Sequence, residues 1–127
     1  MMQFTSEKLH EFVTSRYVRL TSTHRELSIP IINRIYAKMS HGLKFADIHV
    51  CDSLIINGHH RYISALLAGI EIGFIETHKT SATRICDWKD VNFVEIDYDT
   101  KRQIEEHNRN DAYLNDIPLQ DIYDMLK

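Results

Sequence analysis

Apolar side chains recur every three or four residues over 28–42, a spacing that predicts a helix. Ser28 has the side chain of a helix N-cap, and Pro30 falls in the first turn, where its missing N–H does no harm. Gly42 is expected just past the end of this helix. The predicted buried stripe consists of Ile32, Ile35, Tyr36 and Met39.

Helical spacing also occurs near both ends of the chain. A first helix is predicted behind the candidate caps Thr5 and Ser6. Its apolar stripe consists of Leu9, Phe12 and Val13. From Thr100 the pattern becomes helical and polar, and a last short helix is predicted with Asp116 as its cap. The apolar positions of that last helix are Leu119, Ile122, Tyr123 and Leu126.

Short apolar and β-branched runs predict the strands. The runs at 48–50 and 53–56 are close enough to pair as a hairpin. Further strands are predicted over 70–75 and 91–98. Residues 21–27 are mostly polar and are expected to form a solvated loop.

The segment 53–69 combines three of these signals and predicts a strand, a tight turn and a helix. Its apolar run ends at Asn57-Gly58, which is a strong turn dipeptide. The helical positions that follow are Tyr62, Ala65, Leu66 and Gly69. Polar residues that follow Gly58 therefore lie at a helix start.

A helix start can bind an anion, because its first backbone N–H groups have no partner within the helix and its dipole is positive there. Gly58 would let the backbone approach a phosphate closely. His60 and Arg61 would contact the phosphate oxygens, and Arg61 can form two parallel hydrogen bonds. Either His59 or His60 could instead act as a general acid or base near neutral pH. The plainer alternative is a turn whose side chains cap the helix.

Length and composition indicate one domain over residues 1–127. The order of the predicted helices and strands makes this domain α+β, with a small mixed sheet and packed helices. A chain of 127 residues with 43% apolar and 26% charged residues can bury a core without disulfides or a structural metal ion. The net charge of −3 is uneven: residues 1–60 carry seven Lys/Arg and five Asp/Glu, and residues 61–127 carry eight and thirteen. This acidic second half disfavours nucleic-acid binding as the main function.

The turn and its surroundings resemble the signature of the ParB/sulfiredoxin superfamily. The matching sequence is Ile-Ile-Asn-Gly-His-His-Arg-Tyr-Ile-Ser-Ala over 55–65, followed by Ala-Gly-Ile over 68–70. In that superfamily a strand runs into an Asp-Gly-x-His-Arg or Gly-Glu-Arg-Arg turn that opens a helix. The resemblance covers roughly 20–75, including the predicted helix and short strand upstream of the turn.

The resemblance implies binding of a nucleotide (ATP, ADP or CTP, with Mg²⁺ as an accompanying ion) or of a phosphorylated small molecule. Members of the superfamily hold ATP or CTP at this turn, and its free-serine kinases transfer a phosphoryl group. The phosphate-binding residues would be Asn57, Gly58, His59, His60, Arg61 and Arg25. The catalytic candidates are His60 and Glu26, which would accept a proton from a hydroxyl. A phosphotransferase or nucleotide hydrolase is therefore expected.

Two departures from the family pattern narrow this expectation. His59 occupies the position of the catalytic cysteine of sulfiredoxins, so repair of sulfinic acids is not expected. Asn57 replaces the usual aspartate and removes a carboxylate that would support phosphotransfer. Two alternatives remain open, a ParB-like nuclease or nucleic-acid binder and a non-catalytic interaction protein on a degenerate scaffold. A helix-turn-helix module of the partition-protein type is not expected in the remaining sequence.

Other candidate chemistry is weaker. Glu95, Asp97 and Asp99 alternate along the predicted last strand and could hold Mg²⁺, although an exposed strand face is the usual explanation of such a pattern. Cys51 and Cys86 match no zinc spacing and are expected to be free thiols. The sequence has no apolar run of membrane-spanning length and no signal peptide at its start, so a cytoplasmic protein with no membrane contact is expected.

Overall fold

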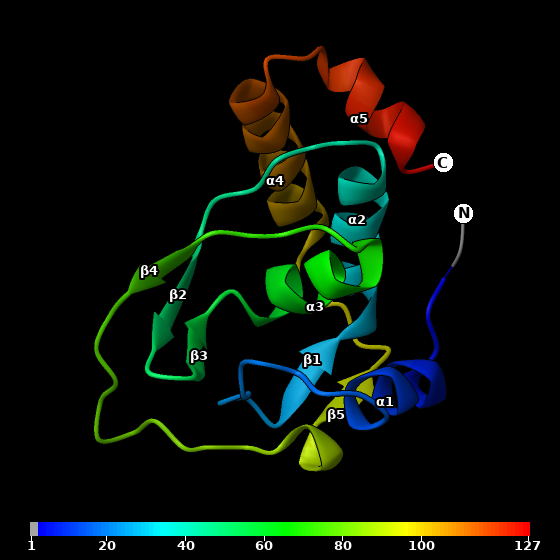
Figure 1. Cartoon of the computed structure of the whole chain (residues 1–127). Helices are drawn as coiled ribbons and strands as arrows, with labels where there is room; N and C mark the ends of the chain where they lie inside the picture. The colour runs from blue at the N-terminus through cyan, green and yellow to red at the C-terminus, as the bar shows by residue number, and fades with distance from the viewer. Residues whose placement is uncertain (1–2) are drawn as a thin grey trace.

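The structure, a computed structural model, describes residues 3–127 (Figure 1). Five α-helices form in this part of the chain: α1 Ser6–Thr14, α2 Ile29–Ser40, α3 His59–Ala68, α4 Lys101–Asn115 and α5 Leu119–Met125. The strands are β1 Glu26–Ser28, β2 Ile48–Cys51, β3 Leu54–Asn57, β4 Phe74–Glu76 and β5 Asn92–Val94. A 3₁₀ turn lies over Trp88–Asp90. Over the described residues, no helix combines the length and apolar character that a membrane crossing requires.

The strands form two small sheets. β2 pairs antiparallel with β3 and parallel with β4, so the larger sheet has the order β3-β2-β4. β1 pairs in parallel with β5, which joins segments far apart in the sequence. The expected α+β class with a small mixed sheet is therefore confirmed. Figure 1 shows α3 beside α2, with α4 and α5 at one end of the molecule.

The buried apolar side chains form two clusters. The main cluster lies among α1, α2, α3 and the strands, and includes Leu9, Leu27, Ile29, Ile32, Ile48, Ile55, Tyr62, Ile63, Trp88 and Phe93. The second cluster lies where α4 and α5 meet the loop after α2. It consists of Leu43, Ala112 and Ile122, with Phe45, Ile117, Leu119, Met125 and Leu126 packed against it. The α4–α5 pair therefore has a core of its own.

Several predicted elements are confirmed. The side chains of Thr5 and Ser28 cap α1 and α2, and Thr100 caps α4 in a capping box with Gln103. The hairpin of β2 and β3 has the predicted location. β3, Gly58 and α3 form the expected strand, turn and helix.

Four predictions of element bounds were wrong. The strand over 70–75 is reduced to the exposed β4, and the strand over 91–98 is reduced to β5. The expected loop over 21–27 contains most of β1, because Leu27 is fully buried and pairs with the β5 backbone. Asp116 adopts a left-handed conformation that ends α4, and α5 begins only after Pro118.

Candidate functional site

A cavity of about 590 Å³ lies between the start of α3, one face of α2 and one face of α4. Asn57, Gly58, His59, His60 and Arg61 line its α3 side. α2 contributes Ile31, Arg34, Ile35 and Lys38, and α4 contributes His107, Asn110, Asp111 and Leu114. The remaining wall is formed by His24, Phe45, Ala46 and Asp99. The cavity thus brings five of the six predicted phosphate-binding residues together.

Gly58 places the start of α3 against this cavity. Its φ of +106° is one that L side chains rarely adopt, and a Cβ there would lie 2.6 Å from Cγ2 of Ile48. Gly58 is the N-cap of α3, and within the described chain no side chain caps this helix. α1, α2 and α4 each have a side-chain cap, whereas the short α5, like α3, has none. The first N–H groups of α3 therefore remain available to a bound acceptor.

Arg61 lies beside the same turn. Its Nη1 donates to the carbonyl oxygens of Ala46 and Asp47 over 3.0 and 3.4 Å. Its Nη2 would be 2.9 Å from a Cβ on Gly58, so the second half of the guanidinium lies next to the helix start. Burial lowers the pKa of Arg61, while the Asp47 carboxylate acts in the opposite direction. The guanidinium has five N–H donors, so donors remain for a ligand.

His59 is only 1% exposed, and its imidazole is neutral. Burial, together with the nearby His24 and His60, lowers the pKa of His59 to about 3. Nε2 accepts a hydrogen bond from the backbone N–H of Thr23 over 3.0 Å, so the proton of the neutral ring is on Nδ1. Among residues 3–127, this buried Nδ1 has no hydrogen-bond partner. The ring of His24 stacks on the ring of His59 at a centroid distance of 3.9 Å.

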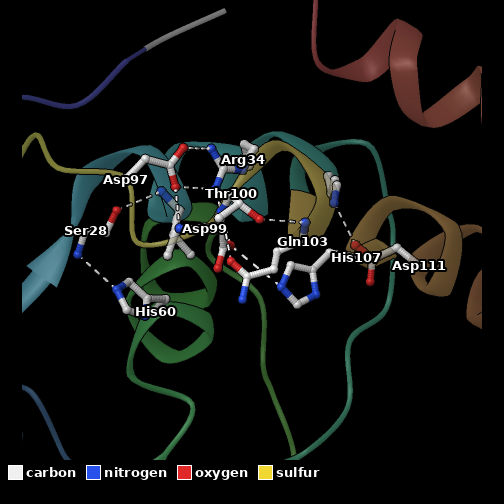
Figure 2. Close-up of polar contacts among 11 residues, drawn as sticks. Ser28, Arg34, His60, Asp97, Asp99, Thr100, Gln103, His107 and Asp111 are labelled. Carbon is white, nitrogen blue, oxygen red and sulfur yellow. Dashed lines mark hydrogen bonds and ion pairs between the residues drawn. The ribbon is translucent and has the colours of Figure 1, made fainter. Parts of the chain in front are cut away.

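His60 has a similar arrangement. Its Nε2 accepts a hydrogen bond from the backbone N–H of Ser28 over 2.9 Å, as Figure 2 shows. Burial, together with His24 and Arg34, lowers the pKa of His60 to about 4, although Asp99 acts in the opposite direction. At neutral pH this imidazole is therefore uncharged, and its Nε2 lone pair is occupied. The geometry suits a positioning role for His60 better than the predicted proton transfer.

Arg25 and Glu26 lie apart from the other predicted site residues. Neither lines the cavity, both are exposed, and it is the preceding residue, His24, that reaches the cavity wall. Glu26 begins β1 opposite Asn92, and the carbonyl of Arg25 accepts a hydrogen bond from the N–H of Asn92. Strand pairing therefore fixes this segment with the two side chains outside the cavity.

The sequence interpretation missed the charged residues on α2 and α4. Arg34 donates two hydrogen bonds to Asp97, over 2.6 and 2.9 Å, and its Nη2 is 3.4 Å from Asp99 (Figure 2). The hydrogen bonds from Arg34 lower the pKa of Asp97. Lys38 forms an ion pair with Asp111 over 2.7 Å. The available signal was the spacing of Arg34 and Lys38, which are four residues apart on α2 and so lie on one helix face.

Asp97 and Asp99, two of the carboxylates considered for Mg²⁺, are thus engaged by Arg34. Within residues 3–127, no group of three His, Cys, Asp or Glu side chains is placed to hold a metal ion. Mg²⁺ is commonly bound by one or two carboxylates together with substrate phosphates. Asp97 and Asp99 are already paired with a cation, so an ion would have to displace Arg34 in order to bind them.

The chain was compared with protein-family models, with curated proteins and with solved structures, and none of the three comparisons gave a match. The ParB/sulfiredoxin resemblance therefore stays a prediction.

Proposed function

We propose that the chain binds a nucleotide or another phosphorylated small molecule in this cavity, with a phosphate group at the start of α3. The supporting observation is the helix start at Gly58, which has no side-chain cap and opens on the cavity. Unpaired N–H groups at the positive end of a helix bind phosphate favourably. Arg61 adds a guanidinium at the same turn.

The remainder of the cavity suits the organic part of such a ligand. Its volume of about 590 Å³ falls within the range typical of small-molecule sites. Ile31, Ile35, Phe45 and Leu114 provide apolar surface in the cavity wall. A base or another flat apolar group would pack there, with the Asn110 amide available for a hydrogen bond.

Membership of the ParB/sulfiredoxin superfamily is part of this proposal, because the strand, turn and helix at 54–68 have the arrangement expected from the resemblance. Cys51 and Cys86 are free thiols, which suits a reducing compartment such as the cytoplasm. We propose binding rather than a particular reaction, since Glu26 lies outside the cavity and His60 is engaged with Ser28.

Isothermal titration calorimetry with ATP, ADP and CTP, each with and without Mg²⁺, tests the proposal. Wild-type protein should bind at least one of them, and Arg61→Ala should weaken that binding about tenfold or more. Arg102→Ala is the matched control, because Arg102 is 90% exposed on α4 and pairs only with Glu106 among the described residues. Circular dichroism of both variants would show whether the fold is intact. No binding at millimolar nucleotide, or equal binding by Arg61→Ala, would exclude the proposed site.

A further inference from the structure

Lys38 is an unusual feature of the cavity wall, since lysine side chains are seldom buried. Its side chain is only 4% exposed, and its ammonium forms an ion pair with Asp111 over 2.7 Å. Lys38 lies on α2 and Asp111 on α4, and both line the cavity. A buried charge therefore lies directly at the space where a ligand would bind.

The ammonium of Lys38 has more donors than acceptors around it. A lysine ammonium has three N–H donors, and among residues 3–127 the Asp111 carboxylate is the only acceptor that Lys38 Nζ contacts. Arg34, one turn earlier on α2, is better satisfied, because Asp97 binds it through two oxygens and Asp99 adds a third contact. Lys38 is thus a buried cation of the cavity wall with donors to spare.

Asp111 lies on α4, which packs with α5 around the second cluster of buried apolar side chains. It lies next to Ala112, which packs with Leu43 and Ile122 in the second cluster. Figure 2 draws Asp111 and His60 at opposite ends of the group of polar contacts. The Lys38–Asp111 pair is therefore separate from the start of α3, although both belong to one cavity.

We propose that Lys38 is a second anion-binding position of this cavity, and that Asp111 occupies it until a ligand with more than one phosphate group displaces the carboxylate. The inference rests on the proposed function and specifies its ligand class as nucleoside di- or triphosphates in preference to monophosphates. One phosphate would bind at the start of α3 and another at Lys38. Exchanging a carboxylate for a phosphate keeps the ammonium of Lys38 paired. The group that loses its partner is Asp111, whose side chain is the more exposed of the two, at 15% against 4% for Lys38.

Calorimetric titrations with ATP, ADP and AMP would test this inference in four proteins. These are wild type, Asp111→Asn, the double variant Lys38→Met/Asp111→Asn, and Asp124→Asn. The double variant removes both charges, so no unpaired buried charge threatens the fold. Asp124→Asn is the matched control, because it makes the same change of charge on α5, where Asp124 pairs with Lys127 outside the cavity.

Wild type should bind ATP about tenfold or more tightly than AMP. Asp111→Asn should bind ATP more tightly than wild type, because the carboxylate that competes with a second phosphate for Lys38 is removed. Its affinity for AMP, which has no second phosphate, should equal that of wild type. The double variant should lose the preference for ATP, and Asp124→Asn should match wild type.

Equal gains for ATP and AMP in Asp111→Asn would indicate a general charge effect and overturn the inference. An unchanged ATP preference in the double variant would overturn it too, while leaving the proposed binding at α3 intact. Failure of ATP, ADP and AMP to bind wild type, together with failure of CTP in the titration described above, would refute the proposed function and this inference together.

Discussion

The Nε2 atom of His60 accepts a hydrogen bond from the backbone N–H of Ser28, across 2.9 Å. Ser28 ends β1 and caps α2, where its hydroxyl accepts from the N–H of Ile31. The bond therefore connects the start of α3 to the junction of β1 and α2. Because an imidazolium has no free lone pair, this bond requires His60 to be neutral.

Stability should fall as the solution is acidified below pH 6.5. The pKa values of His59 and His60 are lowered from 6.5 to about 3 and about 4, so the unfolded chain takes up protons before the folded one does. Their contribution to stability is complete above pH 6.5 and is lost progressively as the pH falls through 4. Urea denaturation should show a loss of about 1 kcal/mol per histidine between pH 7.5 and pH 5.5.

The variant His60→Gln isolates one of these contributions. A glutamine amide oxygen can accept the Ser28 N–H but does not titrate in this range. The variant should lose about half of the pH dependence between pH 7.5 and pH 5.5. If the denaturation midpoint of the variant changes with pH as much as that of wild type, the pKa of His60 is not lowered in the folded protein.

Gly58→Ala should destabilise the protein more than the same substitution at Gly69. Both glycines have positive φ, but a Cβ at Gly58 would also meet Ile48, whereas a Cβ at Gly69 has nothing within 4 Å. We expect a loss of about 3 kcal/mol or more at Gly58 and about 1 kcal/mol at Gly69, measured by urea denaturation. Equal losses would mean that Gly58 and Ile48 do not approach each other as described.

Removing one partner of the Lys38–Asp111 pair should cost more stability than removing both. Lys38→Met leaves the Asp111 carboxylate without its cation and should destabilise the fold by about 3 kcal/mol. Adding Asp111→Asn to that variant should restore most of the loss. A double-mutant cycle based on urea denaturation measures the coupling. Additive losses would show that the two side chains do not interact.

The substitution Ile122→Ala should loosen the α4–α5 pair without unfolding the rest of the molecule. Ile122 is fully buried in the second cluster, and Ile122→Ala should cost about 3 kcal/mol there. Hydrogen exchange should then become faster in α4 and α5 while α2 and α3 stay protected. Uniformly faster exchange in all four helices would instead indicate a single cooperative unit.

The parts of the fold with strong local signals were predictable from the sequence. α2 has a cap, a proline in its first turn and an apolar stripe, and the turn at Gly58 has a distinctive dipeptide between a strand and a helix. β1 was missed because only three residues form it and two of them are polar. Its pairing with β5 is a contact over more than sixty residues, which local patterns do not encode.

The candidate site was predictable only where it is continuous in sequence. Residues 57–61 line the cavity together because they follow one another at a helix start. Lys38 and Asp111 were not recognised, since the pair forms only when α4 folds over the face of α2. His59 and His60 were recognised as functional candidates, but their low pKa values arise from burial that the sequence does not show.

The central claim is that phosphate binds at the start of α3, and a nuclear magnetic resonance titration tests it most directly. ATP would be added to ¹⁵N-labelled protein while the backbone amide signals are followed. The signals of His59, His60 and Arg61 should shift and saturate with a single dissociation constant. If these three signals stay in place up to millimolar ATP, or if only signals far from the cavity move, phosphate does not bind at this helix start.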